Sequence, residues 1–165
     1  MSTIVSWLRL SKAPARPLHA ATHLDRVAEI FVDTSAWYPL VVADHPDHAA
    51  VAAVVEDALR AGTRLVTTNL VVAETHALLL HRTNREHALA FVRAVSEPST
   101  TVVTSTSDLE HVAVHDWLAR FADQAFSLAD AVSFATMKVR GIRRAVTLDR
   151  LFAVAGFVPM GARRL

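Results

Sequence analysis

Short apolar runs that alternate with helical segments constrain the fold of this chain more than any other feature of its sequence. Five such runs occur, at residues 30–32, 65–67, 101–104, 145–147 and 157–158. They are rich in Val and Thr, and runs of this length and composition are typical of strands buried within a parallel sheet. The chain is therefore expected to build a sheet from short, separated strands.

The intervals between these runs carry the periodicity of helices. Apolar residues recur at helical spacing over 51–59, and Gly62 follows as a stop signal. Further helices are expected over 70–81, over 88–95, from a cap at Ser107 or Asp108 to Phe121, and over 127–140. The last helix is apolar nearly all round, so we expect it to be buried. Strands that alternate with helices predict an α/β sandwich with a mainly parallel sheet.

The length of the chain suits a single domain, and its two ends differ from its centre. With 165 residues, 52% of them hydrophobic, one packed core is expected. Residues 1–28 contain two prolines and no strand pattern, so we predict a loosely ordered N-terminal extension there. We expect the folded domain over residues 29–160 and a basic C-terminal tail over 161–165.

Composition and charge exclude several classes of protein. No stretch reaches the roughly 18 apolar residues of a membrane span, so no membrane partner is expected. The lack of cysteine excludes disulfides and thiolate metal sites, and it favours a cytoplasmic location. The net charge is +1, with +3 on residues 1–28 and −2 on the remainder, so nucleic acid would have to bind a local basic surface.

Four acidic residues occupy positions where local patterning favours something else. Asp33 ends the first strand, and Asp149 follows the fourth. Glu74 lies in the most hydrophobic helix, and Asp130 lies near the start of the helix expected to be buried. Acidic side chains are seldom fully buried unless they are paired or bind a cation. Each of the three aspartates also has a local explanation as a helix cap, whereas Glu74 has none.

These four positions are expected to meet at one edge of the sheet, because ligands of parallel sheets bind outside the carboxyl ends of the strands. Four like charges would repel and raise one another's pKa values, and a divalent cation removes that difficulty. An all-oxygen ligand set indicates Mg²⁺, with Mn²⁺ as the alternative. The hydroxyls of Thr34, Ser35 and Thr147 are candidates for further contacts, and turn or cap roles are equally open for them.

The segments around these acids resemble the four acidic motifs of PIN domains, with the nearest likeness to the VapC-type toxins of bacterial toxin–antitoxin pairs. The segments are residues 30–36, 72–74, 127–137 and 147–152. Asp33, Glu74, Asp130 and Asp149 match the four family acids in order, over a resemblance that extends from about residue 29 to about residue 160. Asp123 also matches a recurring acid of this subgroup, and a helix-entry cap is the alternative role for it.

The resemblance implies a three-layer α/β/α sandwich and a Mg²⁺-dependent endoribonuclease that acts as a toxin. All four acids are predicted to be catalytic and metal-binding, with Asp33 and Asp130 holding the metal at the scissile phosphate. Glu74 and Asp149 would position the attacking water or complete a second metal site. The resemblance also implies a small cognate antitoxin and a homodimer. The alternative is a catalytically inactive PIN-like module that binds RNA or a protein partner.

Basic residues that could bind RNA gather near the C-terminus. The stretch contains Lys138, Arg140, Arg143, Arg144, Arg150, Arg163 and Arg164. We expect them to contact phosphates near the acidic site, with a solvated helix end as the alternative. The nine histidines follow no metal-ligand pattern, since no Glu follows His111 in the pair His111 and His115. Trp37 and Trp117 are expected in the core.

Overall fold

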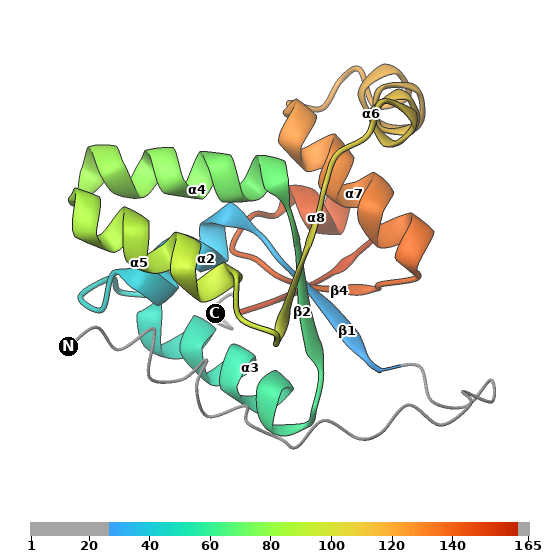
Figure 1. Ribbon diagram of the computed structural model, residues 1–165. Helices are drawn as coiled ribbons and strands as arrows, with labels where there is room; N and C mark the ends of the chain where they lie inside the picture. Colours follow the sequence, from blue (N-terminus) through green and yellow to red (C-terminus); the bar gives the residue numbers. More distant parts are fainter. Residues whose placement is uncertain (1–26, 162–165) are drawn as a thin grey trace.

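The computed structural model describes residues 27–161, in which a five-stranded sheet runs through the middle of the molecule (Figure 1). The strands are β1 (Glu29–Val32), β2 (Arg64–Thr68), β3 (Thr100–Val103), β4 (Arg144–Val146) and β5 (Val158–Met160). All neighbouring strands are parallel, in the order β3-β2-β1-β4-β5. Every predicted strand is present, and the ends differ from the prediction by a residue or two, as strand ends commonly do.

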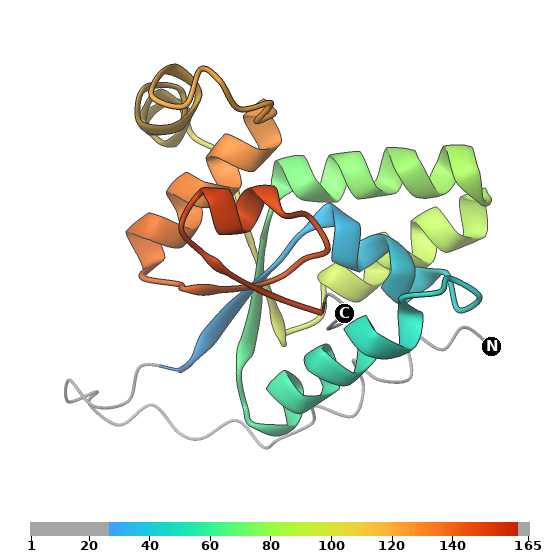
Figure 2. The same cartoon turned by 180° about the vertical axis from the view of Figure 1, so that it is seen from behind.

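Helices cover both faces of this sheet. They are α2 (Thr34–Val41), α3 (His48–Arg60), α4 (Asn69–Arg82), α5 (Arg85–Val95), α6 (Ser107–Ala113), η2 (Val114–Ala119), α7 (Leu128–Arg140) and α8 (Leu151–Val154). The chain steps from β1 through β2 to β3 in one direction and from β4 to β5 in the other. Right-handed crossovers therefore place α3 and α5 on one face and α7 and α8 on the opposite face (Figures 1 and 2). The predicted three-layer sandwich is confirmed.

The helix expected from residue 107 to residue 121 differs from the prediction. Its N-cap is Thr106, whose hydroxyl accepts a hydrogen bond from the Leu109 N–H (3.3 Å), so neither Ser107 nor Asp108 caps it. After Ala113 the chain continues as the π-helical segment η2. This segment turns the buried Trp117 toward α7, where its ring centroid lies 5.2 Å from that of Phe134.

Helix α7 is the centre of the core, as its apolar surface predicted. Residues 131–137 are all buried, and the Phe134 ring packs against Phe126, Phe152 and Phe157. Gly141 ends the helix with a φ of 71°, a left-handed conformation that costs little without a Cβ. Because α7 is held so firmly, its first turn is fixed relative to the sheet, and Asp130 lies in that turn.

The described contacts of the sheet begin one residue before β1. The Ala28 carbonyl accepts a hydrogen bond from the Arg64 N–H (2.8 Å) at the start of β2. The remaining residues of the predicted extension, apart from Val27, lie outside the described residues. The same holds for the predicted basic tail after Gly161, including Arg163 and Arg164.

Candidate active site

The connections that follow the neighbouring strands β1 and β4 run in opposite directions along the sheet and cross opposite faces of it. β1 leads to helices on one face and β4 leads to α8 on the other (Figures 1 and 2), and ligands of open parallel sheets bind at such a switch point, outside the carboxyl ends of the strands. Val32 pairs with Val146 at the end of the ladder, and the Asp33 N–H donates to the Val146 carbonyl (3.1 Å). This register brings Asp33 beside Thr147, although 114 positions separate them in the chain.

Asp33 accepts a set of hydrogen bonds from the two strand ends. Its Oδ2 atom accepts from the Ser35 N–H (3.1 Å), the Ser35 hydroxyl (2.7 Å) and the Thr147 hydroxyl (3.2 Å). Asp33 is also the N-cap of α2, which confirms the cap that the sequence allowed for it. Asp33 is only 6% exposed. The same side chain is therefore both a helix cap and a buried acid.

The environment of Asp33 opposes its ionisation. The pKa of the Asp33 carboxyl is raised from 3.8 to about 6, mainly by burial and to a smaller extent by the charge of Asp130, while hydrogen bonds from Ser35 and the Thr34 backbone oppose the rise. No lysine, arginine or histidine within residues 27–161 forms an ion pair with Asp33. A buried carboxylate that has only neutral donors is an unfavourable arrangement unless a cation joins it.

Two hydroxyls connect Asp33 to the loop that carries Asp149. The Ser35 hydroxyl accepts from the Leu148 N–H (2.9 Å), and the Thr147 hydroxyl accepts from the Asp149 N–H (3.0 Å). Asp149 in turn accepts from the Leu151 N–H (2.8 Å) at the start of α8, although the N-cap residue of that helix is Arg150 and not Asp149 as predicted. These contacts fix the loop after β4 against the loop after β1.

Glu74 also lies near this edge of the sheet, but it is not buried in a hydrophobic helix as the sequence suggested. The residue is exposed, as are Ala73 and Ala77 on the same helix, so α4 does not bury it. The hydrophobic composition of α4 suggested that Glu74 would be buried, but small and apolar residues also occupy the exposed face of this helix, including Leu80, which is 44% exposed. The Thr34 hydroxyl donates to Glu74 Oε2 (2.7 Å), which connects Glu74 to the residue after Asp33.

Asp130 forms the capping box that its spacing predicted. The Asp130 Oδ2 atom accepts from the Ser127 N–H (2.8 Å) and hydroxyl (2.7 Å), and the Ser127 hydroxyl accepts from the Asp130 N–H (3.0 Å). Asp130 is half-buried and close enough for its charge to act on Asp33. Asp123 is exposed and accepts a bond from Gln124, while Ser127 occupies the cap position of α7, so the cap predicted for Asp123 is absent.

The four acids are less tightly gathered than the sequence suggested. Nowhere in residues 27–161 do three acidic or histidine side chains come close enough together to hold one metal ion. The arrangement is a buried acid, Asp33, with Asp130 in electrostatic contact and with Asp149 and Glu74 connected through hydroxyls. The hydroxyls of Thr34, Ser35 and Thr147, whose roles the sequence left open, are therefore the connections within the site.

The expectation that the basic stretch lies beside this site is wrong for most of its described members. Arg140 binds Glu29 at the start of β1, and Arg143 and Arg144 precede or begin β4, so these three lie at the amino edge of the sheet. Lys138 pairs with Asp116 (3.0 Å). Only Arg150, next to Asp149, lies at the acidic edge among these residues. Sequence proximity to Asp149 misled because β4 carries the chain from one edge to the other.

Comparison with known proteins agrees with this geometry. Residues 30–158 match the family model described as "PIN domain". The chain belongs to the PIN-domain family. Over 129 residues it is 35% identical to the 23S rRNA-specific endonuclease VapC20 of two Mycobacterium tuberculosis strains, an alignment that covers 78% of this chain and 95% of that protein.

Solved structures show the same fold. The crystal structure of M. tuberculosis VapC20, described as a sarcin–ricin loop cleaving toxin, has a TM-score of 0.69 at 35% identity and covers 78% of this chain and 96% of its own. FitAcB from Neisseria gonorrhoeae has a TM-score of 0.58 at 16% identity, covers 79% of this chain and 96% of its own, and supports the fold alone. The predicted PIN-domain ribonuclease of VapC toxin type is confirmed, and nucleases of this family generally depend on a divalent metal. None of the helices in residues 27–161 has the length and apolarity that a bilayer span requires.

Proposed function

We propose that this PIN-domain toxin cuts ribosomal RNA and that Asp33, Glu74, Asp130 and Asp149 carry the reaction. The observation on which the proposal mainly rests is Asp33, a carboxylate buried at the switch point of the sheet that forms no ion pair with any lysine, arginine or histidine of residues 27–161. The activity of the M. tuberculosis relative, a 23S rRNA-specific endonuclease, supports the choice of substrate because the alignment spans nearly all of that relative.

The donor set fits Mg²⁺, with Mn²⁺ as the alternative. Every candidate ligand at this edge is an oxygen, and Mg²⁺ is commonly held by one or two carboxylates together with substrate phosphate and water. Asp33 and Asp130 are the pair that meets this requirement, which is why a cluster of three acids is not needed. When bound, the ion neutralises charge on the phosphate and lowers the pKa of a bound water.

The remaining residues hold the carboxylates in place. Ser35 and Thr147 orient the Asp33 carboxylate through Oδ2, and Ser127 orients Asp130 through its own Oδ2. Glu74 and Asp149 lie beyond the central pair and are placed to accept a proton from the attacking water or to bind a second ion. In-line attack on the phosphate would leave a 5′-phosphate and a 3′-hydroxyl on the products.

The proposed partners follow from the relatives. A VapC toxin implies an RNA substrate and an antitoxin that inhibits it. We further propose a homodimer, with the exposed side chain of Val114 at the start of η2 (47% exposed) available for the contact. Light scattering of the purified protein should give twice the mass of the chain, and a monomer at high concentration would contradict the dimer. Activity on ribosomal RNA places the protein in the cytoplasm, where ribosomes are found.

The test is a cleavage assay on isolated ribosomes and on a synthetic sarcin–ricin hairpin. Asp33→Asn and Asp130→Asn should each reduce Mg²⁺-dependent cleavage by at least about 100-fold, because each removes ligand charge and little volume. Chelation of the metal should have the same effect on the unmodified protein. Asp44→Asn is the matched control, since Asp44 is exposed in the loop before α3 and should leave the rate unchanged.

This assay tests the assignment of the site and the proposed cleavage of RNA separately. Cleavage that survives in Asp33→Asn would contradict the assignment of the site. Specific binding of RNA without any cleavage, by the unmodified protein with metal present, would favour the inactive binding module instead. Sequencing of the cut ends would show whether the sarcin–ricin region is the target.

A further inference from the structure

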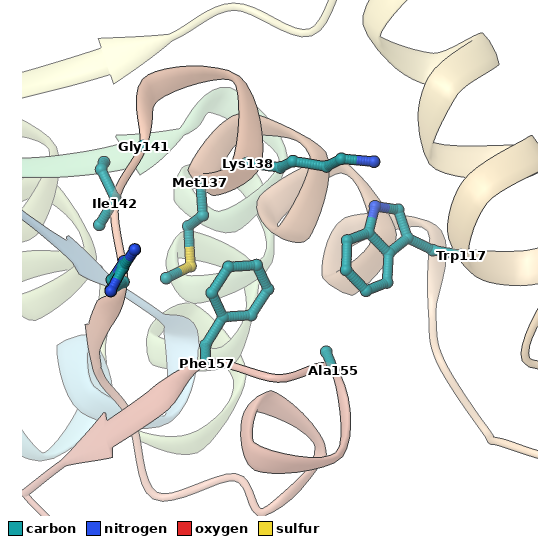
Figure 3. A pocket seen from close by; sticks show the side chains of 8 residues that line it. Trp117, Met137, Lys138, Gly141, Ile142, Ala155 and Phe157 are labelled. Carbon is teal, nitrogen blue, oxygen red and sulfur yellow. The ribbon is translucent and has the colours of Figure 1, made fainter.

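An apolar pocket lies at the opposite edge of the sheet from Asp33. Its volume is about 280 Å³, and it opens between the end of α7 and the turns that precede β4 and β5 (Figure 3). The apolar lining comes from Trp117, Met137, Ile142 and Phe157. Met137 and Ile142 are almost completely buried and form its floor, while Phe157 is half-buried. The nuclease function described above uses none of these side chains.

One polar atom of the pocket lacks a partner. The indole Nε1 of Trp117 is buried and makes no hydrogen bond to any atom of residues 27–161, although buried indole N–H groups usually find an acceptor. Figure 3 shows this nitrogen and the amine of Lys138 on the same side of the pocket. An unsatisfied buried donor is unfavourable, so an acceptor that reached this nitrogen would gain from binding to it.

The rim of the pocket carries positive charge. Lys138 and Arg143 line it, and both are exposed. Lys138 pairs with Asp116, whereas Arg143 forms no ion pair with any residue between 27 and 161. An apolar floor beneath an uncompensated guanidinium suits a ligand that joins an apolar body to a carboxylate, because Arg binds carboxylates through two parallel donors.

We propose that this pocket binds a short segment of a partner protein in which an aromatic or branched aliphatic side chain is flanked by acidic residues. The apolar side chain would occupy the space above Met137 and Ile142, and the carboxylates would meet Arg143 and Lys138. RNA fits less well, since a nucleobase needs hydrogen-bond partners along its edge and this lining is mostly carbon. Apolar anchors in pockets with a polar rim are the usual form of a small protein contact.

Two peptides of equal length and opposite charge test the proposal, with the Trp117 indole N–H resonance of the ¹⁵N-labelled full chain as the reporter. An acetylated, amidated EFLDE peptide should shift that resonance in a saturable way, and the KFLKK peptide should bind at least tenfold more weakly. The resonance is assigned by its loss in Trp117→Phe, and Trp37, whose indole N–H donates to the Thr67 hydroxyl, provides an unaffected indole signal.

Variants separate the pocket from general charge attraction. Arg143→Gln should weaken the acidic peptide at least threefold, while Arg93→Gln, at an exposed position of α5, should leave its affinity unchanged. Ala155→Trp, which fills the pocket from its side, should abolish the shift, and unchanged circular dichroism would show that it folds. Asp33→Asn should retain full binding, so loss of the nuclease does not affect this test.

Three results would overturn the proposal. The first is no shift with either peptide, and the second is equal affinity for both. The third is a shift of the same resonance by polyuridylate that the acidic peptide cannot reverse, which would assign the pocket to RNA.

Discussion

An acidic residue lies at each end of strand β1, and the two differ in the charge of the groups that donate hydrogen bonds to them. Glu29, at the start of the strand, receives two hydrogen bonds from the Arg140 guanidinium, at 2.9 and 2.5 Å. Asp33, just after the end of the same strand, receives its hydrogen bonds from the Ser35 backbone N–H and from neutral hydroxyls. The pairing raises the pKa of Arg140, whereas burial raises the pKa of Asp33 to about 6.

We interpret the contrast as one between an acid that serves the fold and an acid that we propose serves the reaction. At Glu29 the protein supplies its own cation, so the charge is compensated in the folded chain. At Asp33 the charge is buried and no basic side chain in the described part of the chain pairs with it, which is costly for the fold but leaves attraction for a cation from solution. Destabilisation of this kind is common at active sites, where a local arrangement is maintained by the rest of the structure.

The largest expected effect is on the pH dependence of stability through Asp33. Its pKa is about 3.8 when the chain is unfolded and about 6 when it is folded, so the folded state binds the proton more tightly. In metal-free buffer this group therefore costs nothing below pH 3.8, and the free energy of unfolding falls by about 3 kcal/mol as the pH rises through 6. Asp33→Asn should remove that fall and be more stable at pH 8.

Chemical denaturation of both proteins between pH 4 and pH 8 measures this difference. Added Mg²⁺ should stabilise the unmodified protein at pH 8 more than it stabilises Asp33→Asn, because the variant lacks one of the two carboxylates proposed to hold the ion. Parallel pH profiles for the two proteins would contradict the assignment of a buried, unpaired carboxylate.

The sequence predicted this fold well because each element had a local cause. The Val- and Thr-rich runs became strands, and the spacing of Ser127 to Asp130 became a capping box. The order of acids along the chain also predicted the family. What local patterns could not predict was the position of cations, since Arg140 and Arg143 lie close to Asp149 in sequence and at the far edge of the sheet in space.

Burial was the second property that local patterns misjudged. Glu74 lies among apolar residues in sequence, but the exposed face of α4 is itself partly apolar, so composition did not indicate which way Glu74 faces. The hydrogen bond from Thr34 to Glu74 spans 40 positions and depends on how α2 packs against α4. Contacts of that kind follow from tertiary packing, and no short motif encodes them.

The next effect concerns the hydroxyl that orients Asp33. Ser35→Ala removes a donor to the Asp33 carboxylate and also removes the acceptor of the Leu148 N–H. We expect a loss of about 1–3 kcal/mol in the free energy of unfolding and a further rise in the pKa of Asp33, because the Ser35 side chain is the main group that lowers it. The pH at which cleavage becomes half-maximal should therefore move upward, and an unmoved pH profile would show that Ser35 has only a structural role.

A smaller effect is expected at the other end of the strand. Glu29→Gln leaves the shape of the side chain but removes the charge that pairs with Arg140, which should lower the free energy of unfolding by about 1 kcal/mol, since the pair is partly exposed. Cleavage should be unchanged at saturating substrate. A strong loss of cleavage in a stable Glu29→Gln protein would mean that the two edges of the sheet are coupled, and the contrast drawn between them would fail.

The smallest effect is expected from removal of the residues that precede the domain. Deletion of residues 2–26 leaves Ala28, whose carbonyl holds the start of β2, so the sheet keeps its first contact. We expect the melting temperature and the cleavage rate to change little, because Asp33 receives hydrogen bonds from Ser35 and Thr147, which the deletion leaves in place.

The charge of the deleted segment supports a different outcome. The segment has a net charge of +3, because it contains four basic residues and a single acid, Asp25; the basic residues are Arg9, Lys12, Arg16 and Arg26. If these cations help to hold RNA, the truncated protein should bind RNA more weakly and with a smaller salt dependence. Cleavage rates of the full and truncated chains at two salt concentrations distinguish these outcomes, and an insoluble truncated protein would show that the segment packs on the domain.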